Sequence, residues 1–173
     1  MKDFVSLPDG RILGSFTPLE SELLGDLVTQ VIELLDGELP EDRLLASIGI
    51  GGGDGPSSDP AIARLIPDAY PDDEVASREF RHLTEHGLVS RKIANARAFM
   101  LTLDGGGEVV LGPEAQQAWV RTLADIRLVI ASRLGIEHDD DEGRADTDDD
   151  LMLRDVYHWL GMVQSSLVDA LDA

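Results

Sequence analysis

The sequence contains no cysteine among its 173 residues. A disulfide, a thiol switch, a zinc-thiolate site and a cysteine nucleophile are therefore excluded for this chain. The opening residues, MKDFVSLPDG, lack an apolar core of signal-peptide length. No apolar run approaches the roughly 18 residues that a membrane helix needs. These absences predict a soluble cytoplasmic protein.

Basic residues are also scarce, with 14 Lys and Arg against 34 Asp and Glu and a formal charge of -20. Proteins bind DNA through basic residues that displace the counterions of the phosphates, so a chain this acidic is repelled by nucleic acid at long range. Hydrophobic residues make up 43% of the chain, which is enough for a packed core. We expect a single domain over residues 1–173.

Motifs of known enzymes and cofactor sites are missing as well. The tract GIGGGDGPSS has no Lys-Ser or Lys-Thr after it and no G-x-G-x-x-G spacing, so it predicts part of a flexible loop over about 38–58. There is no G-x-S-x-G elbow, and His82 and His86 lack the H-E-x-x-H pattern and further zinc ligands. The sequence therefore predicts a protein that is not an enzyme, with no catalytic, cofactor-binding or metal-binding residues and no cofactor.

One acidic run stands out, because nine of the fourteen residues from Glu137 to Asp150 are acids. The spacing does not fit a calcium-binding EF-hand, since His138 would take the first ligand position and Asp149 the last. A flexible, solvated loop over about 137–150 is the prediction. The acids at 148–150 would lie at the N-terminus of the following helix, where negative charge is favourable.

Turn and helix signals predict a mainly α fold, a single helical-bundle-like domain with a small N-terminal β-hairpin. The hairpin surrounds Pro8-Asp9-Gly10, and a capping box of Thr17 and Glu20 begins a helix that Gly37 ends. Its expected apolar face is Leu19, Leu23, Leu27, Val31, Leu34 and Leu35. Further expected elements are short helices near 41–47 and 61–66, a helix beginning near 72–74, an extra strand near 108–111, and helices over 113–134 and about 150–171.

The last two helices each carry an apolar stripe at helical spacing. The expected core positions are Ala115, Trp119, Leu123, Ile126 and Ile130 in the first, and Leu153, Val156, Tyr157, Leu160, Val163, Leu167 and Leu171 in the second. Trp159 lies beside the second stripe, where it is available for contact with a partner.

The stretch from Leu83 to Gly107 allows two interpretations. Val89, Ile93, Ala96, Met100 and Leu103 recur at helical spacing, whereas Phe99, Leu101 and Leu103 alternate as in a strand. Alternation would support a two-stranded wing, as in winged-helix DNA-binding proteins. We favour the helix, because the segment ANARA is rich in alanine. Gly87 is then expected near the start of this helix, with Thr84 as its cap.

Positive charge is concentrated between Val75 and Leu103, where five basic residues outnumber the two acidic residues Glu79 and Glu85. This segment could contact a phosphate backbone, contact an acidic protein, or pair with the chain's own carboxylates. The candidate partner-binding residues are Arg78, Arg81, Arg91, Lys92, Arg97 and Trp159.

Three segments together resemble a known family: DPAIARLIPDAYPDD, AWVRTLADIRLVIASRLGI and VYHWLGMVQSSLVDAL. The family is an actinobacterial domain of unknown function that includes AosR-like oxidative-stress transcriptional regulators. The resemblance implies a mainly helical domain and a role in transcription through contact with RNA polymerase or a sigma factor. It also implies redox regulation through a cysteine pair, and that mechanism cannot operate in a chain without cysteine.

Three functions are consistent with these observations. The first is a cytoplasmic, non-enzymatic regulator that binds a protein partner, for which a sigma factor or RNA polymerase is the candidate. The second is a winged-helix-like DNA-binding regulator that uses the basic segment 78–97. The third is an enzyme of unrecognised type. We favour the first, because the charge of -20 opposes direct binding to nucleic acid.

Overall fold

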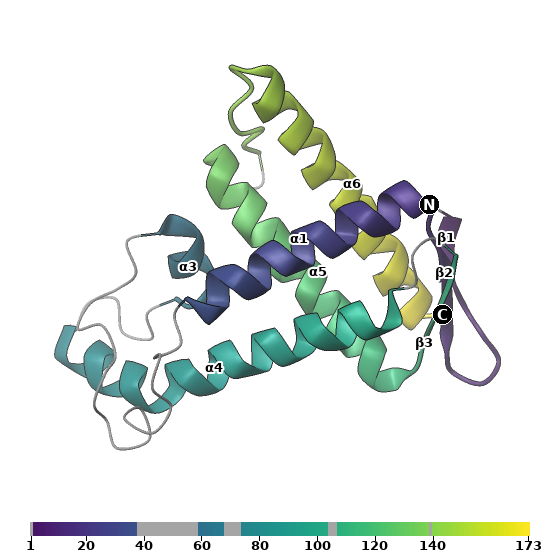
Figure 1. The fold of residues 1–173 in the computed structure, drawn as a ribbon, viewed down its shortest axis with the longest axis horizontal. Helices are drawn as coiled ribbons and strands as arrows, with labels where there is room; N and C mark the ends of the chain where they lie inside the picture. Colours follow the sequence, from purple (N-terminus) through teal and green to yellow (C-terminus); the bar gives the residue numbers. More distant parts are fainter. Residues whose placement is uncertain (1, 38–58, 68–73, 104–106, 139) are drawn as a thin grey trace.

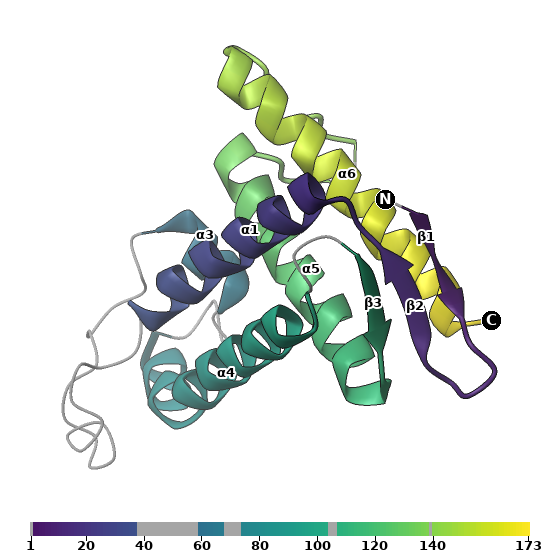
Figure 2. The ribbon, with the colours of Figure 1, turned by 45° about the vertical axis from the view of Figure 1, so that its right-hand side comes forward.

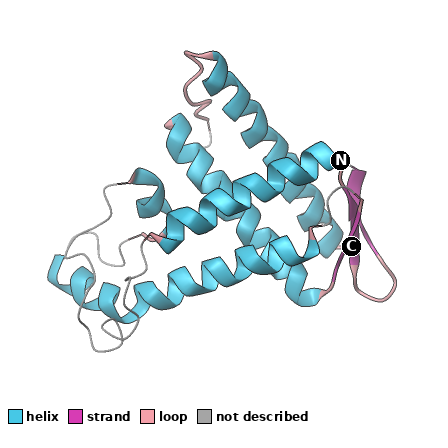
Figure 3. Cartoon of the chain, viewed as in Figure 1, coloured by secondary structure: helices cyan, strands magenta, loops and turns pink. Residues whose placement is uncertain are grey.

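The computed structural model describes residues 2–37, 59–67, 74–103, 107–138 and 140–173, with residues 74–86 described as backbone alone. The predicted loop at 38–58 and the short helix near 41–47 lie outside these ranges. Within them the chain is mainly helical, as the sequence predicted (Figure 3). The elements are β1 (Lys2–Ser6), β2 (Ile12–Ser15), α1 (Pro18–Asp36), α3 (Pro60–Leu65), α4 (Glu74–Thr102), β3 (Glu108–Leu111), α5 (Pro113–Leu134) and α6 (Asp148–Leu171).

Helices α1 and α4 run side by side, and the strands gather at one end, where both chain termini lie (Figure 1). Helix α5 occupies the centre of the fold and packs against α1, α3, α4 and α6. In the turned view α5 passes between α4 and α6, which lie on its two flanks (Figure 2). Any surface that joins α4 and α6 must therefore cross α5.

Local capping residues set most of the helix ends. Thr17 and Glu20 form the predicted capping box, in which the Glu20 carboxylate accepts from the Thr17 backbone N–H at 2.7 Å. Helix α5 begins at Pro113, and Gly135 ends it in the left-handed conformation with a φ of 74°. Helix α6 begins two residues before its predicted start, because Thr147 and Asp150 form a second capping box.

The three strands form one antiparallel sheet in the order β1-β2-β3. β1 and β2 are the predicted hairpin, and β3 is the predicted extra strand. Gly14 has no freedom to carry a side chain, because an added Cβ would lie 2.4 Å from Cε1 of Phe4. The sheet is joined to α6 by the Phe4 backbone N–H, which donates to Oγ of Ser166 at 2.8 Å.

Four aromatic rings from four parts of the chain meet at the centre of the core. Trp119 of α5 is fully buried and stacks on Phe99 of α4, with ring centroids 3.8 Å apart and planes 23° from parallel. Phe4 and Phe16 lie 5.9 Å and 5.7 Å from Trp119. The indole N–H of Trp119 donates to Oγ1 of Thr102 at 2.7 Å, so its one polar group is satisfied. This cluster fixes the sheet, α4 and α5 relative to one another.

The predicted apolar face of α1 is wrong in part. Leu19 is 75% exposed, whereas Leu24 and Val28, which the prediction omitted, are fully buried. Val31 and Leu35 are buried as predicted. Apolar residues occur on more than one face of this helix, so its rotation is determined by packing against α4 and α5, which local spacing does not encode. The predicted faces of α5 and α6 agree with the structure, since Trp119, Leu123, Ile126 and Ile130 are buried, as are Leu160, Val163 and Leu167.

Helix α4 settles the alternative between a wing and a helix. Residues 88–102 are helical, and Val89, Ile93, Ala96 and Phe99 are buried along one side, so the favoured helix is confirmed. The prediction that Gly87 lies near the start of this helix with Thr84 as its cap is wrong. Gly87 lies within a helix that begins at Glu74, because a single glycine lowers helix stability by only about 1 kcal/mol and does not interrupt its hydrogen bonds.

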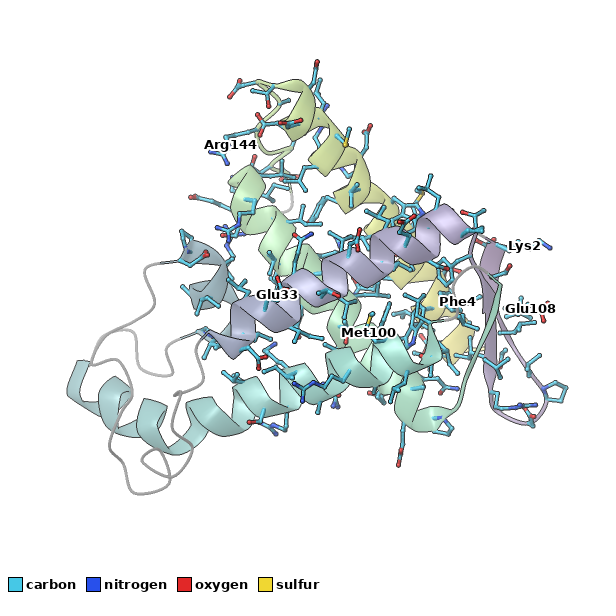
Figure 4. All side chains as sticks on the ribbon, viewed as in Figure 1. Lys2, Phe4, Glu33, Met100, Glu108 and Arg144 are labelled. Atoms are coloured by element: carbon cyan, nitrogen blue, oxygen red, sulfur yellow. The ribbon has the colours of Figure 1, made fainter. Side chains whose placement is uncertain are left out.

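The acidic segment after α5 is held by specific hydrogen bonds. The Asp141 carboxylate accepts from the backbone N–H groups of Glu137 at 3.0 Å and Gly143 at 2.9 Å, and these bonds lower the pKa of Asp141. The Arg144 backbone N–H donates to the Leu134 carbonyl at 2.8 Å, and the guanidinium of Arg144 donates to the Arg133 carbonyl. Figure 4 shows Arg144 at this end of the molecule, far from the sheet. The segment thus turns back onto the C-terminal end of α5.

Candidate functional site

A pocket of about 360 Å³ lies between α4 and α5. It is lined by Leu88, Arg91, Lys92 and Asn95 of α4 and by Arg121, Ala124 and Asp125 of α5. In α4, Arg91 and Lys92 each lie three or four positions from both Leu88 and Asn95. In α5, Ala124 and Asp125 lie three and four positions after Arg121, so each set lies on one side of its helix. The pocket forms where these two faces meet along the edge of the helix pair.

One ion pair joins the two helices at this pocket. The Lys92 ammonium donates to Oδ1 of Asp125 at 2.5 Å, and the two side chains are 17% and 7% exposed. Burial raises the pKa of Asp125 above its ordinary value, although the hydrogen bond and charge of Lys92 act in the opposite direction. Each group is costly to bury without the other, so the pair fixes the register of α4 against α5.

The two arginines of the pocket are not neutralised. Arg91 and Arg121 are exposed, and neither makes an ion pair with any residue that the structure describes. The Arg91 Nε donates only to the carbonyl of Gly87 at 3.3 Å, which is a contact within its own helix. With Lys92 included, three positive groups face one carboxylate, so the pocket carries a formal charge of +2. The rest of the chain is strongly acidic, and the pocket is therefore a local positive site.

The structure separates the residues that the sequence grouped as candidates. Arg91 and Lys92 line the pocket, but Arg97 follows Arg91 by six residues, which places it roughly 120° around the helix. Arg78 and Arg81 lie in the first part of α4, where only the backbone is described. Trp159 is half-buried against the core and belongs to α6, which lies across α5 from α4 (Figure 2). Among the candidates whose side chains the structure describes, Arg91 and Lys92 thus share the pocket, whereas Arg97 and Trp159 lie outside it.

Sequence reasoning missed the contribution of α5 to this pocket. Arg121 and Asp125 are 30 and 33 residues from their α4 neighbours Arg91 and Lys92. The spacing of Arg121, Ala124 and Asp125 could have indicated this contribution, because it places all three residues on one side of a helix whose opposite side is apolar. The pairing of this side with α4 depends on tertiary packing.

Among the residues that the structure describes, no three His, Asp or Glu side chains are close enough together to hold a metal ion. None of their helices combines the length and the hydrophobicity that crossing a membrane requires. His82 and His86 follow one another by one turn of α4, in the part described as backbone alone.

The family of the chain follows from its similarity to known proteins. The family model described as a domain of unknown function, DUF2017, matches residues 1–171, so the chain belongs to this family. The oxidative stress regulator AosR of Mycobacterium tuberculosis (strain ATCC 25618 / H37Rv) is 31% identical over 183 aligned residues. That alignment covers 95% of this chain and 84% of the mycobacterial protein. The regulator of the same name from Mycobacterium bovis (strain ATCC BAA-935 / AF2122/97) has the same identity and coverage. No solved structure matches the chain.

Proposed function

We propose that this chain is a non-enzymatic cytoplasmic regulator that acts by binding a protein partner, with an acidic segment of that partner held in the pocket between α4 and α5. A sigma factor or RNA polymerase is the candidate partner, in the transcription of stress-response genes. Membership of the family and the similarity to proteins named oxidative stress regulators support a regulatory role.

The observation that carries the proposal is the pair of unneutralised arginines in the pocket. The chain has 34 acidic residues, yet none that the structure describes pairs with Arg91 or Arg121. Arginine is among the residues that contribute most to protein interfaces, and its guanidinium binds carboxylates through two parallel hydrogen bonds. Two such groups beside a pocket suit a partner segment that brings two or more carboxylates.

The charge of the whole chain restricts the partner further. At -20, the chain repels a uniformly acidic molecule, so a suitable partner presents its carboxylates locally on a surface that is otherwise neutral or basic. The polar groups of the pocket then favour this segment, while the remaining acidic surface disfavours other acidic proteins. This selection depends on electrostatics, and we expect it to weaken as the salt concentration rises.

Direct binding to DNA through a winged helix is not supported by residues 88–102 of α4. The wing that the alternative requires would lie within residues 88–103, where the structure has a helix up to Thr102. Non-specific binding to duplex DNA normally depends on several phosphate contacts, and the pocket offers two free guanidinium groups. A protein partner needs fewer charged contacts, because apolar packing supplies much of its binding free energy.

The test compares pocket variants for binding to purified mycobacterial RNA polymerase core, holoenzyme and free sigma factors by biolayer interferometry. The double variant Arg91→Ala/Arg121→Ala should bind at least tenfold more weakly than the unaltered chain. The control Lys2→Ala/Arg11→Ala removes the same charge from two exposed basic residues outside the pocket and should bind as the unaltered chain does. Absence of binding to all of these proteins, or equal binding by both double variants, would contradict the proposal.

A further inference from the structure

A second arginine site lies on the opposite flank of α5, where this helix faces α6. The Arg127 Nη1 donates to Oε1 of Gln164 at 2.8 Å, and its Nη2 donates to the hydroxyl of Tyr157 at 3.3 Å. The guanidinium carbon lies 4.8 Å from the centroid of the Tyr157 ring. All of these partners are neutral, and all belong to α6.

Arg127 thus keeps a net positive charge in a half-buried position. It makes no ion pair with any residue that the structure describes, and its Nε–H is buried without an acceptor. A guanidinium is always charged in proteins, and a desolvated charge is unfavourable unless an opposite charge or a full set of hydrogen bonds compensates it. Replacing Gln164 by Glu would supply that charge at a hydrogen-bonded position, yet this acid-rich chain has an amide there.

The residue of α6 beside this guanidinium is Gly161. A Cβ added at Gly161 would lie 3.7 Å from both Cζ and Nη2 of Arg127, which is an ordinary van der Waals contact. Alanine would therefore fit, and alanine is more favourable than glycine within a helix. Glycine in the middle of α6 thus has no steric necessity, and it leaves the Cβ position beside the guanidinium unoccupied.

We propose that Arg127, with Gln164, Tyr157 and Gly161, forms a binding site for a carboxylate of a protein partner. Arg127 supplies the charge and its remaining Nη hydrogens, while Tyr157 and Gln164 hold the guanidinium plane against α6. Carboxylate is the chemical class, because its two oxygens match the geometry of the guanidinium and the site offers one uncompensated positive charge.

The Arg127 site is distinct from the pocket between α4 and α5. Asp125 of the pocket faces Lys92 of α4, whereas Arg127 faces Gln164 of α6. Each site can therefore be removed without touching the other, and neither needs the other to bind an anion. The alternative role for Arg127 is a purely structural clamp between α5 and α6, and this role predicts no binding of acetate at Arg127 in the unaltered chain.

The experiment uses acetate as the probe and the arginine Nε–H signals in ¹H–¹⁵N spectra as the readout. We expect the Nε–H of Arg127 to exchange slowly with water because it is buried, and its signal is identified by its loss in Arg127→Lys. Acetate replaces chloride at constant ionic strength, and we expect a saturable shift of the Arg127 signal. The same titration with inorganic phosphate tests the other oxyanion class. The variant Arg91→Ala/Arg121→Ala should retain the acetate shift, so this result stands or fails independently of the pocket.

Gln164→Glu provides the decisive comparison. It places a carboxylate against Arg127, so the melting temperature should rise by roughly 2–4 °C and the acetate shift should disappear. The matched control Gln117→Glu makes the same change at an exposed position of α5 and should keep the acetate shift. A shift no larger with acetate than with chloride, a larger shift with phosphate than with acetate, or an acetate shift that persists in Gln164→Glu would overturn the proposal.

Discussion

The ammonium of Lys92 lies 2.5 Å from Oδ1 of Asp125, across the contact between the two helices that form the basic pocket. Asp125 is 5% exposed, so the pair places a carboxylate in the protein interior beside two arginines that remain free. The charge of Lys92 therefore helps to hold α4 against α5, and the charges of Arg91 and Arg121 remain available to a partner.

Replacing Asp125 by Asn should change how stability depends on pH. The pKa of Asp125 is raised by burial, so the folded protein retains this proton at pH values where the unfolded chain has lost it. The resulting stabilisation is complete below the unfolded value of about 3.9 and is lost as pH rises through the folded value. The free energy of unfolding of the unaltered chain minus that of Asp125→Asn should therefore fall as pH rises through this range. Urea unfolding of both proteins measures the difference, and an increase with pH would show that Lys92 lowers this pKa.

Replacing Thr102 by Val should reduce stability by about 1–3 kcal/mol, because the buried indole N–H of Trp119 loses its acceptor. Thr29→Val is the matched control, since the Thr29 hydroxyl is exposed and donates only to the Gly25 carbonyl of its own helix. The control should change stability by no more than about 0.5 kcal/mol. Equal losses in the two variants, measured by urea unfolding, would contradict the importance of the Trp119 hydrogen bond.

Two glycine substitutions test the order of the acidic segment. Gly143 has a φ of 71°, and a Cβ there would lie 2.8 Å from Cγ1 of Ile136. Gly10 has a φ of 79°, but a Cβ there would meet nothing within 4 Å. Gly10→Ala should therefore cost only the roughly 1–2 kcal/mol of left-handed backbone, and Gly143→Ala should cost more. A Gly143→Ala protein as stable as the unaltered chain would support the flexible loop predicted over residues 137–150.

The protein should not bind duplex DNA with a submicromolar dissociation constant at an ionic strength of about 0.15 M, where the screening of charges is close to physiological. The reason is the charge of -20 together with the absence of a wing in residues 88–102. Fluorescence anisotropy with a labelled duplex provides the measurement. Submicromolar binding that weakens in Arg91→Ala/Lys92→Ala would instead make the basic segment a DNA contact.

The sequence by itself determined the secondary structure closely. Capping residues and helix-ending glycines act within a few residues, so Thr17 and Gly37 predicted the bounds of α1, and Pro113 and Gly135 those of α5. The spacing from Val89 to Leu103 also distinguished a helix from a wing, because residues three and four apart share one side of a helix. The sequence alone also named Arg91 and Lys92 as candidates for partner binding, because their charges are concentrated within one segment of the chain.

Tertiary structure decided what these elements face. The rotation of α1 depends on its packing partners, and this is why Leu24 and Val28 are buried while Leu19 is exposed. Arg121 joins Arg91, and Arg127 joins Gln164, only because α5 packs between α4 and α6. Whether an arginine is neutralised depends on which carboxylates come within a few ångströms of it, since Coulomb attraction between groups separated in space is invisible to local sequence patterns. The free charges that support both proposed binding sites are thus a property of the packed helices.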